Sequence, residues 1–241
     1  LVGKYIELKD AYKSITESFI HAGAAKNCHV EIIWIQSEDI RDENCLELLS
    51  DLNGILVAPG FGERGIRGKI KAIKIAREYQ IPFFGICLGM QCAVVEFARN
   101  VLKLDNPSST EIDDNPQNPV IDIMENQKNV KKMGGTMRLG AYTCILEQDS
   151  LASQVYGRDK ISERHRHRYE FNNNYLSQFK KAGMMASGIN QETNLVEIIE
   201  LKNHPWFIAT QFHPELKSTV VNPHPLFVGF VDAALKQKKI Q

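Results

Sequence analysis

The hydrophobic positions of the first hundred residues fall into short apolar runs separated by stretches in which apolar residues recur at helical spacing. The apolar runs predict strands at residues 2–6, 30–35, 54–57 and 82–86. The helical spacing predicts helices at about 10–26, 68–79 and 90–98, the first with Asp10 as its N-cap. Strands that alternate with helices are typical of a parallel sheet with helices on both faces.

The second half of the chain has a different pattern. Residues 104–119 are rich in Asp, Asn, Pro and Ser and predict a long surface loop. Short β segments then dominate, at residues 120–124, 139–146, 183–189, 195–201 and 206–211, and an amphipathic helix is expected from Phe227 to about Lys238. We therefore expect one α/β domain over residues 1–241. It should have three layers, with a mostly parallel central sheet, helices on both faces and a small antiparallel β part.

Composition narrows the functional classes. Lys plus Arg and Asp plus Glu number 29 each, and this zero net charge argues against a nucleic-acid-binding or membrane-surface protein. The five cysteines form no C-x-x-C pair, and no zinc-ligand spacing joins them to histidines, so we expect no metal. No signal peptide or apolar run of about 20 residues is present, which favours the cytoplasm. The start at Leu1, without an initiator Met, indicates a piece of a longer protein.

Cys87 stands at the junction of a predicted strand and a predicted helix, in the segment Gly85-Ile86-Cys87-Leu88-Gly89. A Gly-x-Cys-x-Gly junction is the thiol counterpart of the nucleophile elbow, whose sharp turn lifts the side chain out of the sheet. At the amino end of a helix the dipole favours the thiolate. Taken by itself, the motif also fits a small buried cysteine between turn glycines.

A base for this thiol is predicted far downstream, at His213 and Glu215. Pro214 disfavours helical geometry at His213, and in an extended chain residues i and i+2 project to the same side. Glu215 can then reach the imidazole and fix its tautomer, as catalytic bases require. The predicted strand at 206–211 leads to this pair, and the carboxyl ends of strands are where open sheets carry their active sites.

The segments Gly-Ile-Cys-Leu-Gly-Met-Gln and Gln-Phe-His-Pro-Glu, in this order, resemble the triad-type glutamine amidotransferase family. Segments 109–111, 135–140, 163–170, 195–200 and 203–207 are similar to the glutaminase domains of CTP synthases in particular, and the resemblance covers essentially the whole chain. It implies that Cys87, His213 and Glu215 hydrolyse L-glutamine to glutamate and ammonia through a cysteinyl thioester.

The thioester reaction passes through an oxyanion that needs two N–H donors. One donor should be the amide of Leu88, directly after the nucleophile. The other should come from the glycine loop at residues 58–62, where relatives usually carry Pro-Gly-Gly-Phe-Gly. Pro59 replaces the first glycine of that motif and has no N–H, so Gly60 should be the donor.

The substrate's charged groups need one acid and one base. The resemblance points to Glu111 for the ammonium group and Arg168 for the carboxylate, with further contacts to glutamine from Gly60, Leu88, Gly89, Met90 and Gln91. Strand alternation puts Arg164, Arg166 and Arg168 on one face and His165 and His167 on the other, so the arginine face could line a pocket. The same Arg-His run could also form a phosphate or nucleic-acid patch, but the neutral total charge disfavours that interpretation.

Several residues have simpler interpretations. Arg138 resembles a family segment near the interface with the synthase domain, but the sequence by itself indicates an arginine in a flexible loop. His21, His29 and His224 are expected at the surface or at helix ends, and His204 before Pro205 is expected to be structural.

The resemblance also implies properties of a full-length enzyme. It should carry a covalently linked synthase domain, use ATP, Mg²⁺ and GTP, aminate UTP to CTP with the ammonia, and form a homo-oligomer. No cofactor is expected in the 1–241 domain itself, and neither a nucleic acid nor a membrane is an expected partner. Two alternatives remain: a γ-glutamyl hydrolase or peptidase with the same triad, and a catalytically silent regulatory or assembly module.

Overall fold

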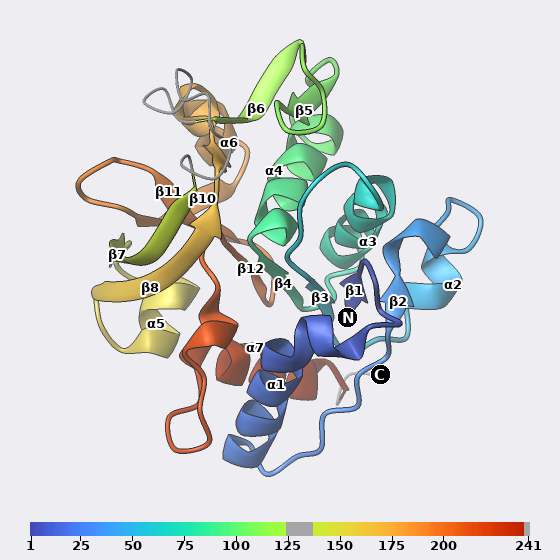
Figure 1. The fold of residues 1–241 in the computed structure, drawn as a ribbon, viewed down its shortest axis with the longest axis vertical. Coiled ribbons are helices and arrows are strands. Elements are labelled where there is room, and N and C mark those ends of the chain that lie inside the picture. Colours follow the sequence, from blue (N-terminus) through green and yellow to red (C-terminus); the bar gives the residue numbers. More distant parts are fainter. Residues whose placement is uncertain (124–136, 239–241) are drawn as a thin grey trace.

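The computed structural model describes residues 1–123 and 137–238 and contains a large twisted sheet (Figure 1). In the described residues this sheet has nine strands, in the spatial order β2 (Ile35–Gln36), β1 (Val2–Gly3), β3 (Ile55–Val57), β4 (Phe83–Ile86), β12 (Phe207–Thr210), β11 (Val196–Leu201), β10 (Met184–Ile189), β7 (Arg138–Leu146) and β8 (Lys160–His167). A second sheet contains β5 (Pro107–Ser109), β6 (Asn118–Ile123) and β9 (Tyr169–Phe171).

The large sheet has a parallel half and an antiparallel half. Strands β2, β1, β3, β4 and β12 run parallel, whereas every pair from β12 to β8 is antiparallel. The two halves meet at β12, which pairs in parallel with β4 so that Thr210 lies opposite Ile86. The predicted α/β class is confirmed, and the antiparallel strands continue the same sheet.

Helices cover both faces of the sheet. One face packs against α3 (Ile66–Glu78) and α4 (Leu88–Asn100), with α2 (Cys45–Leu49) and α6 (Leu176–Lys181) nearby, and the other against α1 (Lys13–Ala25), α5 (Leu151–Tyr156) and α7 (Pro225–Lys238). Figure 1 shows α1 beside α7 and α3 beside α4. A hydrophobic core lies on each face of the sheet, and successive side chains of β4 point into opposite cores. Phe83 packs on Phe207 in the core under α3 and α4, and Phe84 packs on Phe227 in the core under α1 and α7.

Some predicted boundaries were wrong. Strand β1 covers two residues instead of 2–6, and residues 30–34 are not a strand, because this edge has only the short β1 to pair with. Asp10 does not cap α1, since a 3₁₀ helix (Lys9–Tyr12) precedes that helix. The predicted loop 104–119 contains β5, and Met124 and the Gly135-Thr136 part of the family segment lie outside the described residues. Helices α2, α5 and α6 were missed.

No helix in the two described stretches is long and apolar enough to cross a membrane. The longest of them, α7, has 14 residues, fewer than the about 20 that a bilayer requires.

A buried ion pair joins α3 to α4. The Glu96 side chain is fully buried and accepts hydrogen bonds from Arg77 Nη2 at 2.7 Å and Arg77 Nε at 3.0 Å. Asn100 Nδ2 also donates to Glu96 Oε1 at 3.0 Å. Removal of one member of such a pair leaves the other charge without its partner in a partly buried position.

We expect Glu96→Ala to lower the free energy of unfolding by about 3 kcal/mol, because the guanidinium of Arg77 loses its buried partner. Glu78→Ala is the matched control, since Glu78 also contacts Arg77 Nη2, at 3.1 Å, but its side chain is 40% exposed. That change should lower the free energy of unfolding by less than about 1 kcal/mol. Urea unfolding measures both, and equal losses would contradict the assignment.

Candidate active site

Cys87 sits in a strained turn between β4 and α4. Its φ of 52° and ψ of −103° lie in a region that residues with a Cβ rarely adopt. The flanking glycines are required by close packing: a Cβ on Gly89 would lie 2.3 Å from the carbonyl oxygen of Val57, and one on Gly85 would lie 2.8 Å from the Cβ of Ala209. The Cys87 amide donates to the carbonyl of Thr210 at 2.7 Å, which ties the turn to β12.

His213 and Glu215 follow the end of β12. His213 is not helical, as Pro214 predicted, but Glu215 lies in a 3₁₀ turn (Pro214–Leu216) and not in an extended chain. The Nδ1 atom of His213 is 2.7 Å from Oε1 of Glu215, and both side chains are largely buried. The His213 amide donates to the carbonyl of Arg164 on β8 at 2.8 Å. Glu215 therefore orients the imidazole, and the bond to Arg164 fixes the backbone that carries it.

The charge state of His213 depends on its neighbours. Burial by itself would lower the pKa of the imidazole, but the sulfur of Cys87 and the carboxylate of Glu215 outweigh burial and raise the pKa to about 10. Nδ1 faces Glu215, and Nε2 has no hydrogen-bond partner among the described residues. Nε2 remains available for a proton-transfer step.

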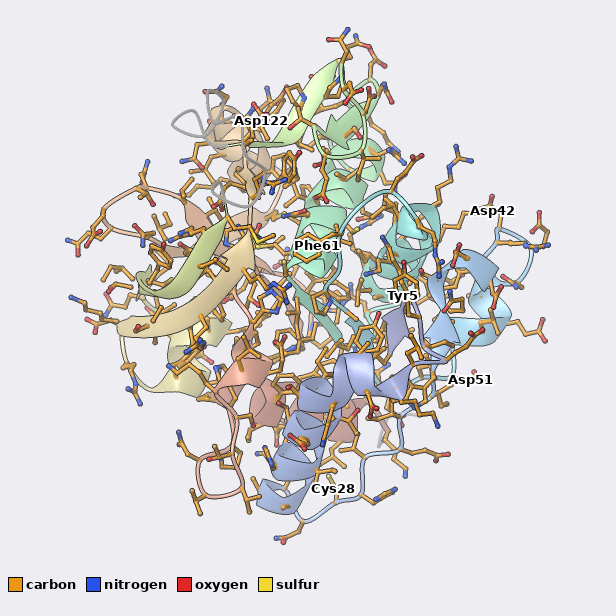
Figure 2. The ribbon with its side chains drawn as sticks, viewed as in Figure 1. Tyr5, Cys28, Asp42, Asp51, Phe61 and Asp122 are labelled. Atoms are coloured by element: carbon orange, nitrogen blue, oxygen red, sulfur yellow. The ribbon has the colours of Figure 1, made fainter. Side chains whose placement is uncertain are left out.

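A cavity of about 320 Å³, including its open mouth, lies in front of Cys87. Its lining contains the predicted residues Gly60, Gln91, Glu111 and Arg168, together with Phe61, Met137, His167 and Tyr169. Figure 2 shows Phe61 near the centre of the view, in front of α4. A larger hollow between residues 28–33 and α7 lies away from Cys87, and its lining is chiefly apolar.

The predicted substrate residues Leu88, Gly89 and Met90 do not line this cavity. They form the first turn of α4, and the Met90 side chain is fully buried in the core, with its amide bound to the Cys87 carbonyl at 3.0 Å. A contact of this turn with a ligand would therefore involve backbone N–H groups, of which those in a first helical turn have no partner within the helix. Leu88 carries the first of these amides.

The charged groups of the cavity lie on different elements. Glu111 Oε1 accepts a hydrogen bond from the amide of Gly62 at 2.8 Å. Arg168 follows the last residue of β8 and is half-buried. The predicted alternation in β8 is present, but it is the histidine face that points inward, whereas Arg164 and Arg166 are exposed. One arginine of this segment, Arg168, therefore lines the cavity, and it lies just beyond the end of β8. The arginine face of the strand does not line it.

Sequence reasoning missed Gln211 and Tyr169 as parts of the site. The fully buried Gln211 has its Nε2 atom 3.8 Å from the Cys87 sulfur and accepts a hydrogen bond from Gln91 Nε2 at 3.3 Å. Gln91 Nε2 also donates to the Tyr169 carbonyl at 3.0 Å. The position of Gln211, two residues before His213 at the end of a buried strand, was a signal that could have identified it.

A layer of buried polar groups lies under β8, formed by Arg138, His165, His167, Glu170 and Glu197. Arg138 Nη2 is 2.7 Å from Glu197 Oε1, and the two imidazoles are 2.8 Å apart. Burial raises the pKa of both carboxyl groups and lowers the pKa of both histidines, that of His167 to about 3. The expectation of Arg138 in a flexible loop was therefore wrong, since it begins β7 and is 4% exposed.

The other histidines divide between surface and interior. His224 stands directly before α7, at a helix end as expected, and it is buried there with Nε2 3.2 Å from Glu163 Oε1. His204 is buried, as a structural residue should be, with Nε2 3.0 Å from the Ala76 carbonyl oxygen. No group of three or more metal-binding side chains is close enough together to hold an ion in the stretches 1–123 and 137–238.

Comparisons with known proteins identify relatives over the whole fold. Residues 7–233 match the sequence model of the class-I glutamine amidotransferases. The chain is 65% identical to CTP synthase from Cytophaga hutchinsonii over 97% of its own length, and 61% identical to CTP synthase from Christiangramia forsetii over 99%. It spans only 43% and 44% of the lengths of these two relatives.

A solved structure has the same architecture. The glutaminase domain of CTPS from Trypanosoma brucei, with bound acivicin, superposes with a TM-score of 0.92 at 36% sequence identity. The match covers 98% of this chain and 92% of that one.

We expect the pKa of His213 to fall in Cys87→Ala, because the sulfur is the largest influence that raises it against burial. In the wild-type chain the imidazole should stay protonated through pH 8 and titrate near pH 10. NMR titration with ¹⁵N-labelled histidine measures both values. A His213 pKa that is the same in the two proteins would contradict the proximity of sulfur and imidazole, and the buried His204 serves as an internal control.

Proposed function

Because the chain belongs to the class-I glutamine amidotransferase family, we propose that it hydrolyses L-glutamine to L-glutamate and ammonia through a thioester on Cys87. The observation that carries this proposal is the cavity in front of Cys87. It combines a thiol in a strained elbow, a His213–Glu215 pair with a free Nε2, and one acidic and one basic side chain on its wall.

In the first half of the reaction, the Cys87 thiolate attacks the carboxamide carbon of glutamine. The C=O bond becomes C–O⁻, and the amides of Gly60 and Leu88 stabilise this oxyanion. The protonated Nε2 of His213 donates its proton to the amide nitrogen, the C–N bond breaks, and ammonia leaves. The high pKa of His213 supports its role as the acid, because the imidazolium is present at neutral pH.

In the second half, neutral His213 takes a proton from water, and the resulting hydroxide attacks the thioester carbonyl. A second oxyanion forms at the same donors, the C–S bond breaks, and glutamate leaves with the thiolate restored. Glu215 holds Nδ1–H throughout and stabilises each imidazolium state.

Recognition of free glutamine requires partners for its α-ammonium and α-carboxylate groups. We assign Glu111 to the ammonium and Arg168 to the carboxylate, because they are the acid and the arginine on the described wall of the cavity. Gln91, which donates to Gln211 and to the Tyr169 carbonyl, also lines the cavity. Gly89 and Met90 contribute the backbone of the first turn of α4.

We further propose that residues 1–241 are the glutaminase domain of a CTP synthase, since the chain spans about two fifths of the relatives that carry this name. The ammonia would then reach a covalently linked synthase domain that aminates UTP with ATP and Mg²⁺, under activation by GTP. The longer protein would act in the cytoplasm as a homo-oligomer. A γ-glutamyl hydrolase would instead accept larger γ-glutamyl compounds, so a comparison of glutamine with γ-glutamyl peptides separates the two activities.

Cys87→Ala should abolish thioester formation from glutamine, and His213→Ala should slow it about 10⁴-fold, whereas Glu215→Ala should retain partial activity. A glutamine-like electrophile should label Cys87 and not Cys92, because burial raises the pKa of the Cys92 thiol to about 11. Burial likewise raises the pKa of Cys144. Ammonia release and peptide mass mapping test these statements. An adduct on Cys92, or full activity of Cys87→Ala, would refute the assignment.

Arg168→Ala and Glu111→Gln should raise KM for glutamine, since each removes a charge-assisted bond worth about 2–3 kcal/mol, or roughly 30- to 150-fold. Glu111→Gln keeps the acceptor oxygen for the Gly62 amide, so it tests the charge alone. Arg164→Ala, on the exposed face of β8, is the control and should leave KM unchanged. Steady-state kinetics measures KM, and unchanged values for the first two variants would remove them from the binding site.

A further inference from the structure

Two buried lysines hold the glycine loop that faces Cys87. The ammonium group of Lys69, on α3, donates to the carbonyl oxygen of Ala58 at 2.5 Å. The ammonium group of Lys4, just after β1, donates to the carbonyl oxygens of Phe61 and Gly62, each at 2.8 Å. All three acceptors lie within residues 58–62, so both lysines act on the same short loop.

The burial of these lysines is unusual. Lys69 is fully buried and Lys4 is 3% exposed. Neither forms an ion pair with a carboxylate of the described residues. An ammonium group taken out of water without a carboxylate partner costs several kcal/mol, and burial accordingly lowers the pKa of Lys69 to about 8. Among the described residues, the hydrogen bonds to the loop carbonyls are therefore the direct polar contacts of these two ammonium groups.

The hydrogen bonds fix the loop on both sides of Gly60. Because a peptide unit is planar, a bound carbonyl oxygen also fixes the direction of the following N–H. Lys69 fixes the plane before Pro59, whose ring sets its own φ. Lys4 fixes the planes on either side of Gly62, whose amide is held in turn by Glu111. The Gly60 amide lies between these fixed units.

The Gly60 amide itself is unoccupied. It donates no hydrogen bond to any of the described residues, and Gly60 lines the cavity that contains the Cys87 sulfur. A Cβ built on Gly60 would lie 3.4 Å from Leu88 Cδ2 and 3.9 Å from Lys69 Nζ. The loop thus rests between the first turn of α4, which carries the Leu88 amide, and the buried ammonium group.

We propose that Lys4 and Lys69 are positioning residues for the oxyanion hole: they hold residues 58–62 so that the Gly60 amide points into the cavity. The proposal rests on the proposed glutaminase function. The two lysines act indirectly, since neither touches the substrate. Their hydrogen bonds set the direction of a donor that acts when the carboxamide oxygen gains negative charge. A misdirected donor would slow thioester formation without weakening the binding of ground-state glutamine.

A different role for Lys69 makes a different prediction. The positive charge of Lys69 also interacts with the sulfur of Cys87, so it could act by stabilising the thiolate. In that case loss of the charge would slow every reaction of the thiol. In the role that we propose, it would slow only reactions that pass through an oxyanion.

The experiment compares Lys69→Met and Lys4→Met with the wild-type chain. Methionine keeps the length and the apolar stem of lysine but donates no hydrogen bond. Two rates are measured for each protein: glutamyl-thioester formation from glutamine, by intact mass after acid quench, and alkylation of Cys87 by iodoacetamide, by peptide mass mapping. Alkylation joins the sulfur to a saturated carbon as iodide leaves, so no oxyanion forms.

We expect thioester formation to slow about 30- to 100-fold in each variant, with the glutamine concentration for half-maximal rate changed less than about twofold. Alkylation of Cys87 should stay within about twofold of wild type. Lys74→Met is the matched control, because Lys74 is exposed on the same helix, and both of its rates should equal those of wild type.

Wild-type thioester rates in both variants would overturn the proposal. A parallel loss of alkylation would also overturn it, in favour of a charge effect on the thiolate. Thermal unfolding midpoints identify a variant that fails to fold. The thioester and alkylation rates of the other lysine variant then test the proposal. If the wild-type chain itself forms no thioester from glutamine, the proposed function fails. That outcome is separate from any difference between wild type and variants.

Discussion

The backbone of Cys87 is the constraint on which the site depends. A residue with a Cβ at a φ of 52° is strained, and the strain persists only where the surrounding structure enforces it. Here α4 approaches so closely that Gly89 touches the carbonyl of Val57, and Gly85 leaves room for Ala209. Each of these contacts excludes a side chain larger than hydrogen. The sulfur is thereby held at the carboxyl end of β4, the edge at which open parallel sheets place their binding sites.

One sheet then brings the remaining groups to that sulfur. The parallel register of β4 with β12 sets Thr210 opposite Ile86, so the chain reaches His213 three residues later, beside the elbow. The antiparallel strands continue from β12 to β8, which binds the His213 amide through the carbonyl of Arg164. The end of β8 delivers Arg168 to the cavity. The parallel half thus supplies the nucleophile and the glycine loop, the antiparallel half ends at the arginine of the wall, and Glu111 follows β5 of the second sheet.

The sequence predicts those parts of the site whose signals are local. The glycines around Cys87 and the proline after His213 each restrict the backbone of their neighbours, so the elbow and the imidazole–carboxylate pair could be inferred without a structure. The inward face of β8 could not be predicted, because arginine and histidine are both polar. The buried His165 faces Glu197, with 3.5 Å between Nε2 and Oε2, and Glu197 belongs to a strand remote in sequence. Arg138 was misplaced for the same reason, since its partner Glu197 is 59 residues away.

The polar layer under β8 also limits which residue can bind the substrate's carboxylate. His167 lines the cavity, yet burial, with the positive charge of Arg138 nearby, lowers the pKa of its imidazole to about 3, so the ring is neutral at physiological pH. Arg138 is directed away to Glu197 at 2.7 Å. A neutral imidazole can offer a hydrogen bond but no net charge. Arg168 is therefore the side chain on the described wall that can supply a full positive charge, and it does so from just beyond the end of β8, not from the strand face on which the sequence pattern grouped it with Arg164 and Arg166.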